Sequence, residues 1–372
     1  MGRKGSAAVA DRLRVGLVFG GRSGEHEVSV VSARSVAGAL DLNRYDIVPM
    51  AIDRAGRWAD AATADRVLRS SGGRPDQVVQ FEGSLGLDPR LVDRAVDVVV
   101  PILHGPFGED GTVQGLCEML GVPYTGCGVA ASAVTMDKVL SKRLFMEAGL
   151  PTPRFEAITA AQWEAERIRC EARCLALRLP VFVKPSRMGS SVGISKVKDV
   201  TTLAPAIELA LGYDDLLIVE EGIPAREIEV AVLEGNPSVA SVPGEIVPGH
   251  EFYDYADKYL DDACRLLAPA PLEPAQIAQV QRLALAGFAA LGCEGMARAD
   301  FLLDTRNNRF LISELNSIPG FTSISMYPRL LGLSGVSYPE LLDRLITLAL
   351  TRRARRQRFA EAALRPLLER AR

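Results

Sequence analysis

Short apolar runs alternate with helix-like segments through the first 130 residues, and this alternation restricts the fold more than any other feature. Runs at residues 14–21, 45–53 and 95–105 have the composition of buried strands, and helix-like segments follow the first and the third. Because parallel strands need a crossover between them, this order predicts a parallel sheet covered by helices on both faces. We therefore expect an α/β fold that begins with a parallel-sheet domain over residues 1–130.

The rest of the chain divides into two further units. A strand-like run at 180–186 lies in a smaller central unit, which we predict over residues 131–223. Two runs at 295–304 and 309–316 are separated by a short polar turn, which is typical of an antiparallel pair. They lie in a predicted C-terminal unit over residues 224–372, so the whole chain is expected to be α+β.

The composition excludes several classes of protein. Of the 372 residues, 43 are Lys or Arg and 46 are Asp or Glu, which gives a net charge of -3. A nucleic-acid partner would require a basic face. No apolar run approaches the roughly 18 residues of a membrane helix, and the first residues do not resemble a secretory signal. We therefore expect neither a nucleic-acid nor a membrane partner.

The cysteines and the C-terminal arginines have ordinary explanations. The six cysteines are scattered and only three histidines are present, so we expect reduced thiols in a cytoplasmic protein rather than a zinc site. The arginine-rich segment 352–358 is expected to be the solvated end of the last helix, where the helix dipole favours cations. Contact with nucleic acid or a membrane is the alternative.

Polar side chains share one face of the predicted C-terminal strand pair. Arg298 and Asp300 are two residues apart on the first strand, and Glu314 and Asn316 are two apart on the second. If the hairpin closes symmetrically, Asp300 faces Glu314 and Arg298 faces Asn316. Two carboxylates directly opposite each other repel, so a positive charge must lie beside them.

Two kinds of positive charge could neutralise these carboxylates. Arg298 alone would form a structural ion cluster. Oxygen ligands from Asp, Glu and Asn instead suit Mg²⁺, which binds one or two carboxylates together with phosphates and water. The hairpin therefore predicts either an arginine cluster or a magnesium site whose phosphates come from a ligand.

A loop of small residues could bind those phosphates. Lys184 ends a strand and precedes Gly189, Ser190 and Ser191, whose backbone N–H groups could close over an anion. This is not the usual P-loop order, because the lysine precedes the glycines.

Three glutamates follow the next strand. Glu220, Glu221 and Glu227 could accept hydrogen bonds from an adenine amino group or from ribose hydroxyls, or they could form a charged turn at the sheet edge. The residues alone leave both readings open.

Seven motifs occur in the order found in D-alanine–D-alanine ligases, which are enzymes of the ATP-grasp superfamily. They are VFGGRSGEHEVSVVSA, LHGPFGEDGTVQG, MDK, VKPSRMGSSVG, EFYDYADKYL, ARADFL and ELNSIPGFTSISMYP. The chain resembles these enzymes from about Arg14 to Leu345. The resemblance implies a three-domain ATP-grasp fold, with a Rossmann-like N-terminal domain and two ATP-grasp subdomains that hold ATP between them.

The resemblance also implies roles for individual residues. The implied ATP-binding residues are Lys138, Lys184, Ser190, Ser191, Glu220, Glu221, Ile223, Glu227 and Lys258. The implied ligands of Mg²⁺ or Mn²⁺, with two ions expected, are Asp300, Glu314 and Asn316. The implied catalytic and substrate-binding residues are Glu27, His104, Ser190, Tyr259, Arg298, Gly320 and Ser325.

The implied reaction joins two D-alanines for peptidoglycan synthesis. The first D-alanine would attack the γ-phosphate of ATP and become an acyl phosphate, and the amine of the second would then attack the acyl carbon. Arg298 and the N–H of Gly320 would stabilise the resulting oxyanion. Glu27 would bind the first ammonium and Ser325 the second carboxylate.

The resemblance further implies a lid and a homodimer. Glu27, Ser190 and Tyr259 would form a hydrogen-bonded trio that positions the lid loop at 249–262. Tyr259 also favours D-alanine as the second substrate. The homodimer would form through the first domain.

Three alternatives remain to be weighed. A related ligase could use D-lactate or D-serine as the acceptor. An NAD-dependent oxidoreductase would need glycine at Phe19 to complete its phosphate-binding motif, and it leaves the acidic hairpin unexplained. A nucleotide-binding module without catalysis would not need Arg298, the metal ligands and Tyr259 together.

Overall fold

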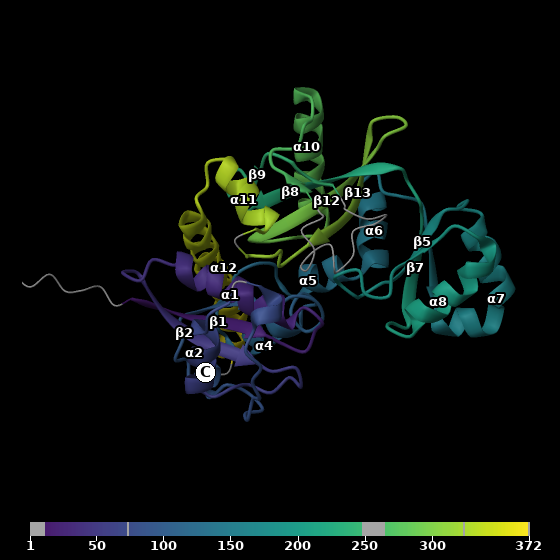
Figure 1. Ribbon diagram of the computed structural model, residues 1–372. Helices are drawn as coiled ribbons and strands as arrows, with labels where there is room; N and C mark the ends of the chain where they lie inside the picture. Colours follow the sequence, from purple (N-terminus) through teal and green to yellow (C-terminus); the bar gives the residue numbers. More distant parts are fainter. Residues whose placement is uncertain (1–11, 73, 248–264, 323, 371–372) are drawn as a thin grey trace, which may run out of the picture.

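The computed structural model contains three separate sheets, one in each predicted part of the chain (Figure 1). It describes residues 12–72, 74–247, 265–322 and 324–370. Within these residues, no helix is both long enough and apolar enough to cross a membrane.

The N-terminal domain is built on a parallel sheet in the strand order β2-β1-β3. Its strands and helices are β1 (Leu13–Gly20), α1 (His26–Ala39), β2 (Tyr45–Ile52), α2 (Ala61–Arg69), η1 (Pro75–Gln77), α3 (Pro89–Val92), β3 (Val98–Ile102) and α4 (Thr112–Leu120). Gly20 ends β1 with φ +90°, and a Cβ there would lie 2.2 Å from the carbonyl oxygen of Ile52. The tight turn after β1 therefore requires glycine, and the predicted parallel sheet is confirmed.

The central domain is an antiparallel sheet in the order β4-β7-β5-β6, with two helices on one face. Its elements are β4 (Phe155–Thr159), α7 (Ala160–Leu175), β5 (Val181–Pro185), β6 (Ser195–Val197), η2 (Val200–Thr202), α8 (Leu203–Leu211) and β7 (Leu216–Glu221). Side chains alternate along the strands, so Val181 and Val183 are buried against the helices while Phe182 and Lys184 lie on the other face.

The third sheet has the order β11-β10-β8-β12-β13, with β9 paired to β8. Its elements are β8 (Ala225–Leu233), β9 (Val239–Ala240), β10 (Gly244–Val247), β11 (Arg265–Leu267), α10 (Pro274–Ala290), β12 (Met296–Asp304) and β13 (Arg309–Asn316). The pairing of β12 with β13 is antiparallel, with Asp300 opposite Glu314 and Arg298 opposite Asn316. The predicted register is confirmed.

A β-bulge on β13 produces that register. Asp300 pairs with Glu314, but its neighbour Phe301 pairs with Ile312, so Ser313 has no partner of its own across the ladder. Without the extra residue, strict alternation would turn Glu314 toward the same face as Ile312, which is buried in the core. The bulge lets one short strand bury Ile312 and still present its two polar side chains on the opposite face.

Two helices that precede the central sheet pack elsewhere. α5 (Val129–Met136) and α6 (Lys138–Glu147) contact β13, and Phe145 of α6 is fully buried in the core of the third sheet. The chain therefore enters the central sheet only after it has contributed to the third sheet's core.

The last helix returns to the N-terminal domain, and the helix before it packs on β8 of the third sheet (Figure 1). α11 (Met326–Leu333) and α12 (Tyr338–Arg370) share one hydrophobic core with β1 and β3. That core also includes Leu233 and Ile318 of the C-terminal part of the chain. The N-terminal domain and the third sheet are therefore joined by a continuous apolar interface.

The arginine-rich segment of α12 is not simply solvated, in contrast to the sequence-based expectation. Arg352 is buried, and its guanidinium donates to the carbonyl oxygens of Gly126 and Tyr124 at 2.5 and 2.6 Å. Arg355 and Arg356 pair with Glu294. These arginines attach the helix to the two domains beside it.

Candidate active site

The polar face of the third sheet carries a dense cluster of charges. The Arg298 guanidinium makes a bidentate contact with Asp300, with both distances 2.7 Å, and lies 3.1 Å from the buried carboxylate of Glu229. Burial would lower the pKa of Arg298, but Asp300 and Glu229 outweigh burial and raise this pKa well above its usual value. The guanidinium is therefore held as a cation between two carboxylates.

The same cluster contains the predicted metal ligands. The Asn316 amide donates to Asp300 Oδ2 at 2.9 Å, and Lys138 Nζ lies 3.6 Å from Glu314 Oε2. Within the described residues, no three His, Cys, Asp or Glu side chains group as a metal site. Two carboxylates and an amide nevertheless match the oxygen donors that Mg²⁺ accepts when phosphates complete its shell. The donor set fits magnesium, and Arg298 neutralises part of it in this structure.

A second charged cluster lies on the open face of the central sheet. Glu220 bridges two lysines, with Lys142 Nζ 2.6 Å from Oε1 and Lys184 Nζ 2.5 Å from Oε2. Burial would raise the pKa of Glu220, but the two ammonium groups lower it to about 2. Burial also lowers the pKa of Lys142, whereas Glu220 raises that of Lys184. Glu220 is thus an ionised carboxylate at neutral pH.

The two clusters belong to one site. Glu314 and Glu227, both on the third sheet, act on the charge of Lys184 in the central sheet. Glu314 acts in the same way on Lys142. The lysines predicted to bind phosphate therefore lie within electrostatic reach of the predicted metal ligands.

Glu221 and Ile223 lie at the end of this region. The Glu221 carboxylate accepts from the backbone N–H and the guanidinium of Arg154, both at 2.9 Å. Ile223, which follows β7, is partly exposed. Glu221 is the last residue of β7, and its side chain is already paired there.

The loop after β5 has a strained backbone. Ser190 and Ser191 have φ values of 49° and 59°, which non-glycine residues adopt uncommonly. Lys138 Nζ donates to the carbonyl oxygen of Met188 at 2.7 Å. The Ser190 hydroxyl is buried and has no hydrogen-bond partner among the described residues. Its predicted partner Tyr259, together with Lys258, lies outside the described residues.

Glu25, rather than Glu27, faces this loop. A Cβ on Gly189 would lie 3.0 Å from Glu25 Oε2, and a Cβ on Gly105 would lie 3.1 Å from it. Glu27 instead points toward Arg54 and Gln80 and forms an ion pair with Arg54. The geometry therefore does not bring Glu27 to Ser190. Sequence reasoning missed Glu25. The signal that could have indicated it was the pair of glycines Gly105 and Gly189, which leave no room for a side chain beside the Glu25 carboxylate.

His104 is buried and both of its ring nitrogens contact protein. Nδ1 lies 3.1 Å from the carbonyl oxygen of Ile318, and Nε2 lies 3.2 Å from Ser32 Oγ. Burial lowers the pKa of His104, which favours the neutral ring. Among the described residues, His104 thus holds other residues in place and has no nitrogen left for a substrate.

Gly320 and Ser325 lie together in the segment after β13. A Cβ on Gly320 would lie 2.8 Å from Ser325 Oγ. The Ser325 hydroxyl also accepts from the backbone N–H of Thr322 at 3.0 Å. Within the described part of the chain, no acceptor receives the N–H of Gly320. This N–H is available to a ligand.

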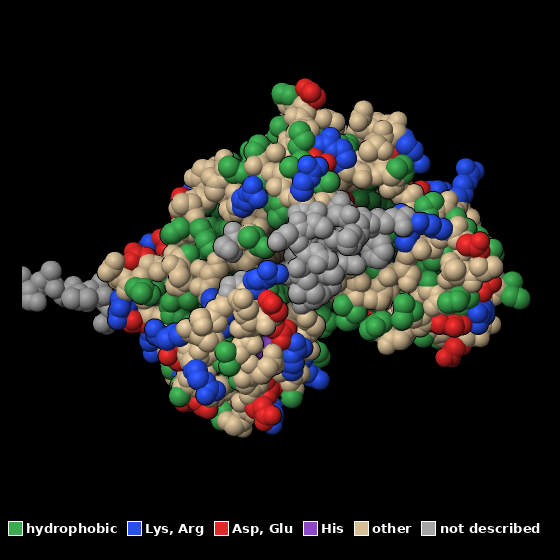
Figure 2. All heavy atoms as spheres, viewed as in Figure 1, with side chains coloured by type: hydrophobic (Ala, Val, Ile, Leu, Met, Phe, Trp, Pro, Cys, Tyr) green, Lys and Arg blue, Asp and Glu red, His purple; other side chains and the backbone are tan. Residues whose placement is uncertain are grey.

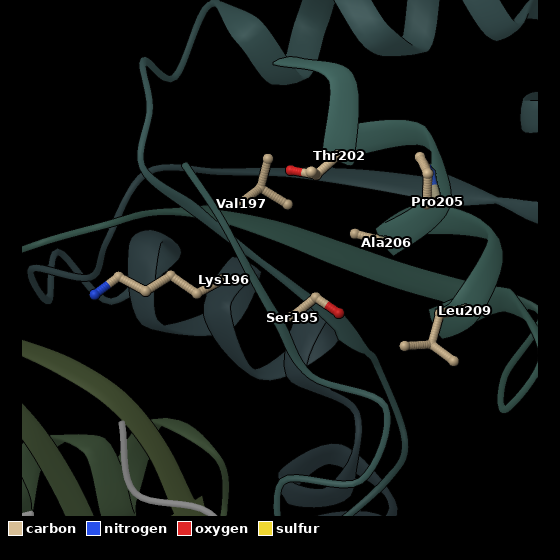
Figure 3. Close-up of a pocket in the computed structure, with 7 residues that line it drawn as sticks. All are labelled: Ser195, Lys196, Val197, Thr202, Pro205, Ala206 and Leu209. Carbon is tan, nitrogen blue, oxygen red and sulfur yellow. The ribbon is translucent and has the colours of Figure 1, made fainter. Parts of the chain in front are cut away.

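A small hollow elsewhere in the central domain does not belong to this site. It has a volume of about 230 Å³, lies between β6 and α8, and contains none of the predicted site residues (Figure 3). The side chain of Lys196 extends away from the apolar lining of the hollow (Figure 3). Its ammonium lies 5.6 Å from the centroid of the Phe182 ring, on the other face of the sheet. The hollow is on the helix-covered face, and the charged groups are on the other.

The visible surface carries no single-sign patch of the kind that nucleic acids require. Figure 2 shows Lys and Arg side chains interspersed with Asp and Glu over the face drawn. The three lysines of the candidate site, Lys138, Lys142 and Lys184, are mostly buried and are paired with glutamates.

The fold and the site define a class of protein. Two antiparallel sheets bring lysines and carboxylates together beside a parallel-sheet domain, which is the ATP-grasp fold expected from the sequence. Comparison with known proteins identifies the family. The sequence matches the families described as "D-ala D-ala ligase N-terminus" over residues 14–127 and "D-ala D-ala ligase C-terminus" over residues 144–347. The chain belongs to the D-alanine–D-alanine ligase family.

Individual proteins that are similar to this chain carry the name of the same family. The chain is 46% identical to the D-alanine–D-alanine ligase of Chloroherpeton thalassium, over 96% of this chain and all of that protein. It is 47% identical to D-alanine–D-alanine ligase A of Bradyrhizobium diazoefficiens, over 94% of this chain and 98% of that protein.

Solved structures of similar fold include ligases named for different acceptors. The D-alanine–D-alanine ligase of Coxiella burnetii is similar with a TM-score of 0.79 and 34% identity, over 95% of this chain and 98% of that one. The VanG D-Ala:D-Ser ligase of Enterococcus faecalis is similar with a TM-score of 0.76 and 33% identity, over 91% of this chain and all of that one.

Proposed function

We propose that this enzyme uses ATP to join two D-alanines into D-alanyl-D-alanine, a precursor of peptidoglycan. Membership of the D-alanine–D-alanine ligase family over nearly the whole chain supports the overall reaction. The observation that carries the site is the convergence of Lys138 and Lys184 with the Asp300–Glu314 pair, because a polyphosphate needs both cations and a bridging metal.

ATP binds between the central sheet and the third sheet in this proposal. Lys138 and Lys184 hold the phosphates, with the strained turn at Ser190 and Ser191 closing over them. Glu220, Glu221, Ile223 and Glu227 surround the nucleoside, and Lys258 reaches the terminal phosphate. Binding requires Lys184 to exchange its 2.5 Å contact with Glu220 for a phosphate oxygen, which leaves Lys142 to neutralise Glu220.

Asp300, Glu314 and Asn316 would hold Mg²⁺ or Mn²⁺, with two ions expected. The metal would neutralise charge on the phosphates during transfer. Arg298 is paired with Asp300, one of the residues that would hold the metal. Its second contact, with buried Glu229, keeps the guanidinium beside the reacting centre.

The protein's own groups then act on the two amino acids. Glu25 is placed to bind the ammonium of the first D-alanine, in the role that the sequence motifs had suggested for Glu27. Arg298 and the N–H of Gly320 stabilise the oxyanion formed when the second amine attacks the acyl phosphate. Ser325 binds the carboxylate of the second substrate, and Tyr259 closes the lid over Ser190. Exclusion of water protects the acyl phosphate from hydrolysis.

Phosphate release from ATP tests the proposal directly. Wild-type enzyme should release phosphate only when D-alanine is present, and D-alanyl-D-alanine should form in equal amount. D-serine and D-lactate are tested side by side with it as acceptors, because a similar structure is named as a D-Ala:D-Ser ligase. Phosphate release that needs no amino acid would contradict every ligase assignment, and faster turnover with D-serine would change the acceptor.

We further propose a homodimer that forms through the N-terminal domain and a cytoplasmic location. Met119 of α4 supports such an interface, since this large apolar side chain is 91% exposed. Light scattering should give twice the 40.0 kDa mass of one chain, and Met119→Lys should shift the protein toward monomer. A monomeric wild type would contradict the dimer.

A further inference from the structure

The backbone on both sides of Gly320 is held by side chains from other parts of the chain. Ile318, two residues before it, donates its N–H to Glu109 at 3.2 Å and receives His104 Nδ1 on its carbonyl oxygen at 3.1 Å. Phe321, directly after it, donates its N–H to Ser32 Oγ at 3.3 Å and accepts the Tyr338 hydroxyl at 2.8 Å. Between them, the N–H of Gly320 has no acceptor within the described part of the chain.

Ser32 connects the two ends of this arrangement. It lies in α1 of the N-terminal domain and is fully buried. Its Oγ accepts the N–H of Phe321 and lies 3.2 Å from His104 Nε2. One hydroxyl therefore links Phe321, directly after Gly320, to the ring that binds Ile318, two residues before it.

In the series of hydrogen bonds that runs from Phe321 through Ser32 and His104 to Ile318, the donor and the acceptor of each bond are determined. The carbonyl oxygen of Ile318 can only accept, so His104 must carry its hydrogen on Nδ1. A neutral ring then leaves Nε2 as an acceptor, and burial favours the neutral ring. The Ser32 hydroxyl consequently donates to Nε2, while its lone pair accepts from Phe321. No member can reverse without leaving a buried polar group unpaired, which is costly.

We propose that Ser32 is a positioning residue that fixes the direction of the Gly320 N–H toward the oxyanion of the amine-attack step. This inference rests on the proposed function, in which Gly320 is an oxyanion donor. Ser32 touches no reacting atom and acts through His104 and Phe321. An oxyanion donor stabilises the transition state only when its N–H points at the position that the oxygen reaches there. Ser32 thus couples a helix of the N-terminal domain to the second chemical step.

Ser32→Ala tests the proposal, with Ser29→Ala as the matched control. Ser29 is also fully buried in α1, one turn earlier, but its hydroxyl accepts from the N–H of Gly20 and donates to Ile102, and it does not reach the Gly320 segment. Both variants should lose similar stability. Only Ser32→Ala should lower kcat for dipeptide formation, by about tenfold to a hundredfold, with the KM for ATP unchanged.

A measurement of the first step separates positioning from general damage. Exchange of ¹⁸O between the bridging and non-bridging positions of ATP, in the presence of D-alanine, reports reversible formation of the acyl phosphate. Ser32→Ala should keep this exchange within about twofold of the wild type, because the oxyanion donor acts in the later step. Ser32→Cys, which has nearly the same size and a weakly bonding thiol, should give the same pattern and serves if the alanine variant does not fold.

Three results would overturn the inference. Unchanged dipeptide formation in Ser32→Ala would do so, as would an equal fall in Ser29→Ala. Equal slowing of the isotope exchange and of dipeptide formation would assign Ser32 a structural role only. A wild-type enzyme without D-alanine-dependent phosphate release would instead remove the proposed function itself, so the two failures are distinguishable.

Discussion

Single carboxylates determine most of the chemistry available to this site. Glu314 is 34% exposed and lies 3.6 Å from Lys138, whereas Glu220 is almost fully buried between two lysines. The exposed carboxylate can exchange its partner for a metal at little cost, because water already screens it. The buried carboxylate can release Lys184 to a phosphate because Lys142 stays beside it, but losing both partners would carry a large penalty. Glu314 is therefore suited to a changing ligand, and Glu220 to a lasting pair with Lys142.

Glu314→Gln should abolish metal-dependent turnover and leave the fold intact. The amide removes the negative charge that a divalent cation needs, while a partly exposed position tolerates the change. We expect no phosphate release above background, and a free energy of unfolding within about 0.5 kcal/mol of the wild type. Phosphate release and chemical denaturation measure the two quantities. An unchanged turnover rate would count against the metal assignment.

Glu220→Gln should destabilise the fold strongly. It leaves buried Lys142 without its carboxylate, and breaking a buried pair from one side costs about 3–5 kcal/mol. Glu340→Gln is the control, because Glu340 pairs with Arg344 on the exposed surface of α12 and should cost about 0.5 kcal/mol or less. Urea denaturation of both variants checks the difference. Equal losses would mean that the Glu220 contacts contribute little.

Sequence reasoning identified the chemical groups of the site better than their individual orientations. Asp300, Glu314 and Asn316 could be predicted to converge, because strand alternation fixes the face of each side chain. Glu25 and Glu27 could not be separated in this way. They sit two residues apart at the start of a helix, where the entering backbone, not periodicity, decides which one faces Gly189.

At the level of elements, two local features determine how the site and the helix α12 are positioned. The bulge at Ser313 turns Glu314 and Asn316 away from the core, and the arginines of α12 attach that helix to its neighbours. The hairpin register followed from the sequence, but the bulge did not, since a symmetric turn gives the same Asp300–Glu314 pair. The buried position of Arg352 was also not predictable, because its partners are backbone carbonyls distant in sequence.

Arg352→Met should loosen the attachment of α12. Methionine fills part of the volume but leaves two buried carbonyl oxygens, those of Gly126 and Tyr124, without donors. Unpaired buried acceptors cost about 1–3 kcal/mol each, so we expect a loss of about 2–6 kcal/mol. Arg344→Met on the exposed side of the same helix should change stability by about 0.5 kcal/mol or less. Thermal unfolding compares the two, and equal midpoints would contradict the role of Arg352.

At the scale of the whole molecule, the N-terminal domain and the Gly320 segment meet across buried polar groups. Glu109 accepts from the N–H groups of Gly105 and Ile318 at 2.8 and 3.2 Å. Burial, with the nearby charge of Glu25, raises the pKa of Glu109 to about 8. The domain boundaries predicted from sequence, 1–130, 131–223 and 224–372, stay a proposal. They cut across these shared interfaces, because local sequence patterns do not predict contacts between distant segments.

This interface should make stability depend on pH. Between the ordinary glutamate pKa and about 8, folded Glu109 keeps a proton that the unfolded chain has released. Stability from this group is therefore greatest at low pH, falls as pH rises through that range, and levels off above about 8. The free energy of unfolding of the wild type should decline more steeply from pH 5 to pH 8 than that of Glu109→Gln. Parallel curves for the two proteins would contradict the assignment.

The return of α12 to the N-terminal core has a consequence for biosynthesis. Strands β1 and β3 are translated before the other two sheets, yet the side chains that complete their core, such as Leu341 and Ile346, follow both of those sheets in the sequence. On the ribosome, the N-terminal domain must therefore keep an incomplete apolar surface until the other two sheets have been made. Its core closes only once α12 is available, and a nascent chain released before then would be a substrate for chaperones.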